Sequence, residues 1–186
     1  MRTIYLDYNA TTPLDARVRE AMLPAFEEAW GNPSSIHHVG QSARALLDDA
    51  RERVAATLMC KPSELIFTSG GSESTNLALL GMARHLRSRG RHIITSAVEH
   101  DAVLHPCEYL ANYDGFEVSF LPVDSVGRVS PDAVREAIRP DTVLVSIMAA
   151  NNELGTIQRW PKLVLFVPSL ASFSTPTPSS GSANFP

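Results

Sequence analysis

The stretch that decides the fold is residues 65–80, L-I-F-T-S-G-G-S-E-S-T-N-L-A-L-L. This order predicts a strand over 65–68, a tight glycine loop, and a helix to about residue 87 whose start, apolar nearly all round, should be buried. Such a loop exposes backbone N–H groups at the positive end of the helix dipole, which suits a phosphate. An ordinary turn capped by Ser72 explains the loop equally well, because neither common nucleotide-binding fingerprint is matched.

The rest of the chain repeats this alternation of strands and helices. Further strands are predicted over 92–96, 116–123 and 142–148. Helices are predicted over 15–29, 40–58 and 130–138, and a further helix carries Val103, Cys107 and Leu110 at helical spacing. Pro24 should bend or end the first helix. Alternation of this kind is typical of an α/β fold with a parallel sheet covered by helices.

Composition narrows the class of protein. The chain has 186 residues, of which 44% are hydrophobic and 19% charged, so it is long enough for one soluble domain. Its formal charge of −4 argues against a nucleic-acid partner. Cys60 and Cys107 lack the spacing of a metal site or a disulfide framework and fit a reducing cytosol. Without a signal-peptide or membrane-length apolar run, we predict a cytoplasmic protein with no membrane partner.

The character of the sequence changes near residue 160. Residues 161–186 contain six serines and five prolines, and their one charged residue is Lys162. We therefore predict a domain over 1–160, followed over 161–186 by an unrelated low-complexity tail that is disordered.

Polar residues follow three of the predicted strands, at 69–72, 99–100 and 151–153. In an open parallel sheet, ligands bind at the carboxyl ends of the strands. A phosphate loop, an imidazole and a carboxamide at one edge suit a phosphorylated aromatic cofactor, with the imidazole stacked on its ring. Taken alone, His100 is more typical of a structural residue, and it is the convergence of the three sites that favours a ligand.

Five motifs follow one another in order along the chain: Y-L-D-Y-N-A-T-T-P (5–13), G-N-P-S-S-I-H (31–37), T-S-G-G-S-E-S-T-N (68–76), E-H (99–100) and N-N-E-L-G (151–155). From about residue 3 to 158 the chain resembles the N-terminal half of a cysteine desulfurase, a pyridoxal-phosphate enzyme of the class V aminotransferase group. The first and last motifs favour the desulfurase branch. The resemblance implies the large domain of the aspartate aminotransferase-like fold, truncated.

The resemblance also implies roles for individual residues. Gly71 and Ser72 match residues that bind the cofactor phosphate. His100 matches the catalytic histidine that stacks on the pyridine ring and transfers protons, and Asn152 matches the asparagine that bonds the ring hydroxyl. Two further segments match regions near the active site: residues 9–12 at the substrate entrance, and 31–38, with His37, near the dimer interface.

The implied activity is removal of sulfur from L-cysteine with pyridoxal 5'-phosphate. It gives alanine and an enzyme persulfide for iron–sulfur cluster or thio-cofactor assembly, in a homodimer that meets a sulfur-acceptor or scaffold protein. The family's Schiff-base lysine, its pyridinium-binding aspartate and its nucleophilic cysteine should follow N-N-E-x-G, but the last acid here is Glu153. Lys61, Lys162, Cys60 and Cys107 lack the right context. We therefore expect an N-terminal fragment that is inactive alone.

Other readings remain open. The parent could be another class V enzyme, such as a selenocysteine lyase or an aminotransferase. The chain could also be a non-catalytic truncated product that docks on a full-length subunit. A generic nucleotide-binding α/β domain is disfavoured, because the dinucleotide fingerprint is absent. A fragment with an open sheet edge should be marginally stable and poorly soluble.

Overall fold

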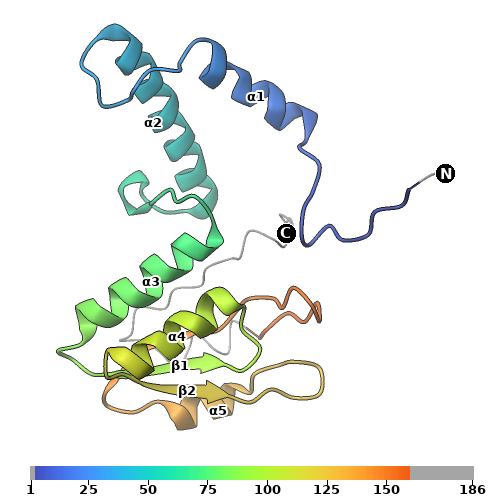
Figure 1. Ribbon diagram of the computed structural model, residues 1–186, viewed down its shortest axis with the longest axis vertical. Coiled ribbons are helices and arrows are strands. Elements are labelled where there is room, and N and C mark those ends of the chain that lie inside the picture. Colours follow the sequence, from blue (N-terminus) through green and yellow to red (C-terminus); the bar gives the residue numbers. More distant parts are fainter. Residues whose placement is uncertain (1–2, 160–186) are drawn as a thin grey trace. The chain divides into compact units, whose positions relative to one another are not determined.

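The structure is a computed structural model that describes residues 3–159. The predicted boundary at residue 160 and the tail over 161–186 lie outside the described residues. The chain divides into two compact units: one combines the residues up to Ala10 with those from Thr68 onward, and the other is Thr11–Phe67 (Figure 1). Within residues 3–159, none of the helices combines the length and apolar character needed to cross a bilayer.

A three-stranded parallel sheet organises the first unit. Its strands are β1 (His92–Ser96), β2 (Glu117–Leu121) and β3 (Thr142–Ser146), in the order β2-β1-β3. All five residues of β1 are buried, as expected for a central parallel strand that is covered on both faces. The prediction for 92–96 is confirmed at both ends, and the other two strands form but are shorter than predicted.

Helices cover both faces of this sheet (Figure 1). Ile93 of β1 packs in a cluster with residues of α3 (Gly71–Leu86) and α4 (Asp101–Tyr113). Ile94, which points to the opposite face, packs with Val134 of α5 (Pro131–Ala137). The spacing predicted for α4 is confirmed, because its three apolar residues, Val103, Cys107 and Leu110, are all buried.

Two expectations about the fold-deciding stretch are wrong. Residues 65–68 form no strand, although Leu65 has extended backbone (φ −94°, ψ 131°). The Leu65 carbonyl instead accepts a hydrogen bond from Arg51 Nη1 at 2.6 Å, and no described strand pairs with the segment. The start of α3 is not buried all round either. Leu77 is 51% exposed, since the buried face of α3 consists of Thr75, Leu79 and Ala83.

The second unit contains α1 (Ala16–Glu27), α2 (His38–Leu58) and the short 3-10 helix η1 (Pro62–Glu64). Asp15 caps α1, because its side chain accepts a hydrogen bond from Arg17 N at 2.8 Å. Pro24 lies inside α1, and its carbonyl accepts from the backbone N–H groups of residues 28 and 29 just past the helix end. The helix therefore continues through Pro24 and ends at Glu27, two residues before the predicted end.

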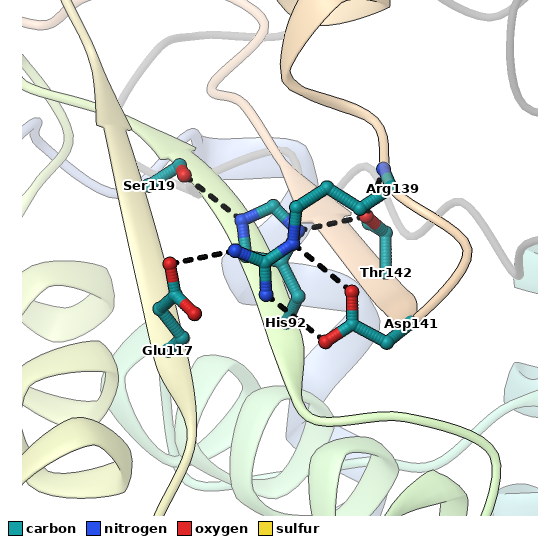
Figure 2. A network of polar contacts seen from close by, with 6 residues as sticks. All are labelled: His92, Glu117, Ser119, Arg139, Asp141 and Thr142. Carbon is teal, nitrogen blue, oxygen red and sulfur yellow. Dashed lines mark hydrogen bonds and ion pairs between the residues drawn. The ribbon is translucent and has the colours of Figure 1, made fainter.

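Polar side chains join the three strands where they begin (Figure 2). The fully buried imidazole of His92 is hydrogen-bonded through Nδ1 to Thr142 Oγ1 at 2.7 Å and through Nε2 to Ser119 Oγ at 2.8 Å. Burial lowers the pKa of His92, so the ring is neutral near pH 7. We call the six residues of Figure 2 the strand-start network: His92, Glu117, Ser119, Arg139, Asp141 and Thr142.

Arg139 closes this network on its outer side. Its Nη1 lies 2.6 Å from Glu117 Oε1, and its Nη2 lies 2.9 Å from Asp141 Oδ2. Gly90, just before β1, belongs to the same region, since a Cβ at this position would lie 2.2 Å from the Asp141 carbonyl oxygen. Only glycine permits this approach of the two backbones.

Candidate functional site

Gly71 and Ser72 are the first two residues of α3. Their backbone N–H groups belong to the first turn, which has no intrahelical acceptors and carries the positive end of the helix dipole. The one carboxylate of this turn, Glu73, is turned back to the loop, where its Oε2 accepts hydrogen bonds from Ser69 N at 2.7 Å and Ser69 Oγ at 2.5 Å. These bonds lower the pKa of Glu73 and engage the carboxylate that would otherwise compete for the turn's donors.

His100 is the N-cap of α4, and its Nδ1 accepts a hydrogen bond from Ala102 N at 3.0 Å. Since Nδ1 is the acceptor, the proton of the neutral ring lies on Nε2. Ser72 and His100 line one open pocket of about 640 Å³ between α3 and α4. The other lining residues are Asn76, Leu80, Arg84, Asp101, Ala102, His105, Pro106 and Tyr109.

Asn152 lies in the turn after β3, half-buried, and is not among the residues that line this pocket. Its backbone carbonyl accepts a hydrogen bond from Asn9 Nδ2 at 2.8 Å. The structure therefore brings Ser72 together with His100, and Asn9 together with Asn152. A second hollow of about 660 Å³, lined mostly by α5 and the loop before it, includes none of the predicted site residues among its described lining.

The N-N-E-L-G motif makes a tight turn around Asn151. Asn151 Oδ1 accepts hydrogen bonds from the backbone N–H groups of Glu153 at 2.9 Å and Leu154 at 2.8 Å. Gly155 then donates its N–H to the Asn151 carbonyl at 2.9 Å with φ of +70°, in the left-handed region that favours glycine. The first asparagine and the glycine of the motif thus shape the turn that presents Asn152.

Sequence reasoning placed Glu99 at this edge but gave it no role. Its side chain is buried, and Oε1 accepts hydrogen bonds from Ser96 Oγ at 2.8 Å and Met148 N at 2.6 Å. Burial raises the pKa of Glu99 to about 7. The available signal was an acid directly after a buried strand, but its partner is 49 residues away in the sequence.

His37 lies in the second unit, where it is the N-cap of α2 and its Nδ1 accepts from Gly40 N at 3.3 Å. This contact gives His37 a helix-capping role within its own unit.

Comparison with known proteins agrees with the order of the motifs. The aminotransferase class-V family matches residues 4–169. The cysteine desulfurase IscS of Dictyoglomus turgidum is 55% identical over 157 residues, which are 84% of this chain and 40% of that protein. The chain therefore spans about two-fifths of the length of this curated relative.

Two solved structures show the same fold. A NifS-like protein aligns with a TM-score of 0.85 and 45% identity, covering 88% of this chain and 45% of the other. The structure of SspA in complex with cysteine aligns with a TM-score of 0.83 and 41% identity, covering 89% and 47%. The predicted α/β class is confirmed, and the parallel sheet with its helices is part of the pyridoxal-phosphate-dependent transferase fold. The chain belongs to the class-V aminotransferase family and corresponds to the N-terminal part of its cysteine desulfurase relatives.

Proposed function

We propose that this chain is the cofactor-binding portion of a cysteine desulfurase, which removes sulfur from L-cysteine and leaves alanine. One observation carries the proposal. Ser72 and His100, from the N-terminal ends of two different helices, line a single pocket. The desulfurase relatives support the choice of reaction within the family.

The donors at this edge fit pyridoxal 5'-phosphate. The first-turn N–H groups of Gly71 and Ser72, with the Ser72 hydroxyl, would hold the phosphate at the positive end of α3. The imidazole of His100 would stack on the pyridine ring, and the side-chain amide of Asn152 would bond the ring hydroxyl. The cofactor, when bound, supplies an electron sink for the substrate carbanion.

His100 would also move a proton. The Ala102 N–H fixes Nδ1 as an acceptor, which orients the ring and leaves Nε2 as the nitrogen that exchanges a proton with substrate. As the N-cap of α4, His100 is held in a defined position, because its hydrogen bond to the helix backbone fixes the orientation of the ring.

Neither Cys107 nor Lys61 is suited to complete the reaction. Burial raises the pKa of the Cys107 thiol to about 12, so it supplies no thiolate near neutral pH. Lys61, the one lysine within residues 3–159, is the N-cap of η1. We propose that the chain alone is inactive. The Schiff-base lysine and the nucleophilic cysteine would come from the rest of a longer, cytoplasmic, homodimeric protein that passes sulfur to an acceptor or scaffold protein.

A chimaera tests this proposal. Residues 1–158 would replace the matching segment of the Dictyoglomus turgidum relative. Alanine and sulfide would be measured after adding L-cysteine, pyridoxal phosphate and an excess of a thiol reductant, which reduces the persulfide and releases its outer sulfur as sulfide. We expect an active chimaera, a loss of about a hundredfold with His100→Ala, and full activity with Glu108→Ala, an exposed carboxylate on the same helix. A folded chimaera that holds the cofactor but releases no sulfide would overturn the desulfurase assignment. Activity on selenocysteine alone would favour a lyase.

A further inference from the structure

Two side chains connect the segment after β1 with the segment after β3. Glu99 Oε1 accepts a hydrogen bond from Met148 N at 2.6 Å, and Asn151 Nδ2 donates to the Val98 carbonyl at 3.0 Å. The contacts are reciprocal, because each segment sends one side chain to the backbone of the other. We call these four residues the strand-end clamp.

The clamp begins where the backbone pairing of the two strands ends. The last pair in the β1–β3 register is Thr95 with Ser146, and both clamp contacts lie beyond it. Both side chains are nearly covered, with Glu99 8% and Asn151 7% exposed. A buried N–H group needs an acceptor, so the Glu99 carboxyl replaces the partner that a longer ladder would have supplied to Met148.

We propose that Glu99 and Asn151 are positioning residues that fix the spacing between His100 and Asn152, an inference that rests on the function proposed above. Each clamp side chain directly precedes one of these two residues in the sequence. A shift of one segment against the other would change the distance between the group stacked on the cofactor ring and the group bonded to its hydroxyl.

Further contacts hold both ends of this arrangement. On the β1 side, Ser96 Oγ donates to the same Glu99 oxygen at 2.8 Å. On the β3 side, Asn9 Nδ2 donates to the Asn152 carbonyl. Side chains that touch a ligand need supporting contacts of this kind, because a displacement of about 1 Å removes the productive geometry.

Variants of the full 186-residue chain test the inference. Glu99→Ala removes the acceptor, whereas Glu99→Gln keeps an oxygen that can accept from Met148 N. Glu108→Ala, an exposed carboxylate on α4, is the matched control. Three quantities would be measured: hydrogen exchange of the Met148 amide, NMR signals of the His100 ring and the Asn152 side-chain amide, and affinity for pyridoxal phosphate by equilibrium dialysis.

We expect Glu99→Ala to lose protection at Met148, to shift both sets of signals, and to bind pyridoxal phosphate about tenfold more weakly. Glu99→Gln should restore the signals and the affinity, and Glu108→Ala should behave as the wild type. If Glu99→Ala does not fold, Asn151→Asp decides in its place. That change removes the donor to Val98 but keeps the oxygen that accepts from residues 153 and 154.

The outcomes separate this inference from the proposed function. Failure of the wild-type chain to bind pyridoxal phosphate would count against the proposed function, while the signals of His100 and Asn152 would still report on the clamp. Unchanged signals in a folded Glu99→Ala or Asn151→Asp variant would overturn the positioning role, whatever the affinity of the wild type.

Discussion

The three parallel strands begin at one end of the sheet and finish at the other, and the polar side chains at these two ends have different bonding partners. Where the strands begin, His92 and Arg139 are bonded to neighbouring side chains of the strand-start network (Figure 2). Where the strands end, Glu99 and Asn151 bond to backbone groups, and Ser72 and His100 line a pocket. In the first case polar side chains bond to one another, and in the second they bond to backbone groups next to the residues that we propose bind the cofactor.

Within one sheet, the starts of the strands are suited to hold the strands together, and their ends are suited to present side chains for chemistry. Parallel strands all begin at one edge and all end at the other, so the chain can tie its strands together at the first edge and present donors at the second. Burial favours the neutral form of both His92 and Glu99, but because one is a base and the other an acid, their effects on stability have opposite pH dependence.

The largest expected effect is the loss of the strand-start network. His92→Ala removes two buried hydrogen bonds and leaves a cavity, which should lower the free energy of unfolding by about 3–4 kcal/mol in urea denaturation. His85→Ala, an exposed histidine on α3, is the control and should change it little. Equal stability of the two variants would mean that this edge does not anchor the sheet.

The next effect is the pH dependence that Glu99 creates. Its folded pKa of about 7 lies above the ordinary value of 4.5, so the native state binds more protons between these two pH values. The stability contribution is therefore complete below pH 4.5 and is lost as the pH rises to about 7, by roughly 3 kcal/mol at most. Urea titrations of wild type and Glu99→Gln should differ in slope across this window, and parallel curves would contradict the burial argument.

A smaller effect is expected at the turn of the N-N-E-L-G motif. Gly155→Ala forces a Cβ into the left-handed region and should cost about 1 kcal/mol. Gly81→Ala within α3, where a Cβ would meet nothing within 4 Å, is the control and should be neutral or stabilising. If both substitutions raise stability, the turn does not need glycine.

The smallest effect is the acid side of the stability profile. Burial lowers the pKa of His92 below 6.5, so below this pH the unfolded state binds a proton that the native state does not bind. The contribution of His92 to stability should therefore fall as the pH drops below 6.5, against the larger and opposite contribution of Glu99. His92→Gln should remove this slope while Glu99→Gln leaves it intact. If Glu99→Gln removed the loss of stability at acid pH and His92→Gln did not, the roles assigned to these two residues would be wrong.

Local patterns predicted the elements that have a clear residue signature of their own. The spacing of Val103, Cys107 and Leu110 located α4, and the short segment H-I-I-T-S after the Gly90-Arg91 turn located β1. The segment 65–68 was wrongly predicted to be a strand. A strand forms only when it pairs with a neighbouring strand, and the composition of a segment does not show whether such a neighbour exists. The strand-end rule predicted the place of His100 after β1, whereas Ser72 reaches the same pocket as a residue of the first turn of α3 and not as the end of a strand.

Contacts over long sequence separations were beyond such patterns. The clamp joins residues about 50 positions apart in the sequence. Glu99 bonds to the backbone N–H of Met148 because the β1–β3 hydrogen-bond ladder stops before that residue, and the sequence does not show where the ladder stops. The same limit applies to the burial of Leu77, because only the tertiary arrangement decides which face of an apolar helix is covered.

The hydrogen bond between Asn9 and Asn152 spans 143 positions. During translation at roughly 5–20 residues per second, the first of these residues emerges on the order of ten seconds before the second. In that interval all of Thr11–Phe67 is synthesised, and its helices can form from local contacts. The N-terminal segment thus joins a unit whose strands are made later, so the Asn9–Asn152 contact can form only after the whole of Thr11–Phe67 and all three described strands have been synthesised.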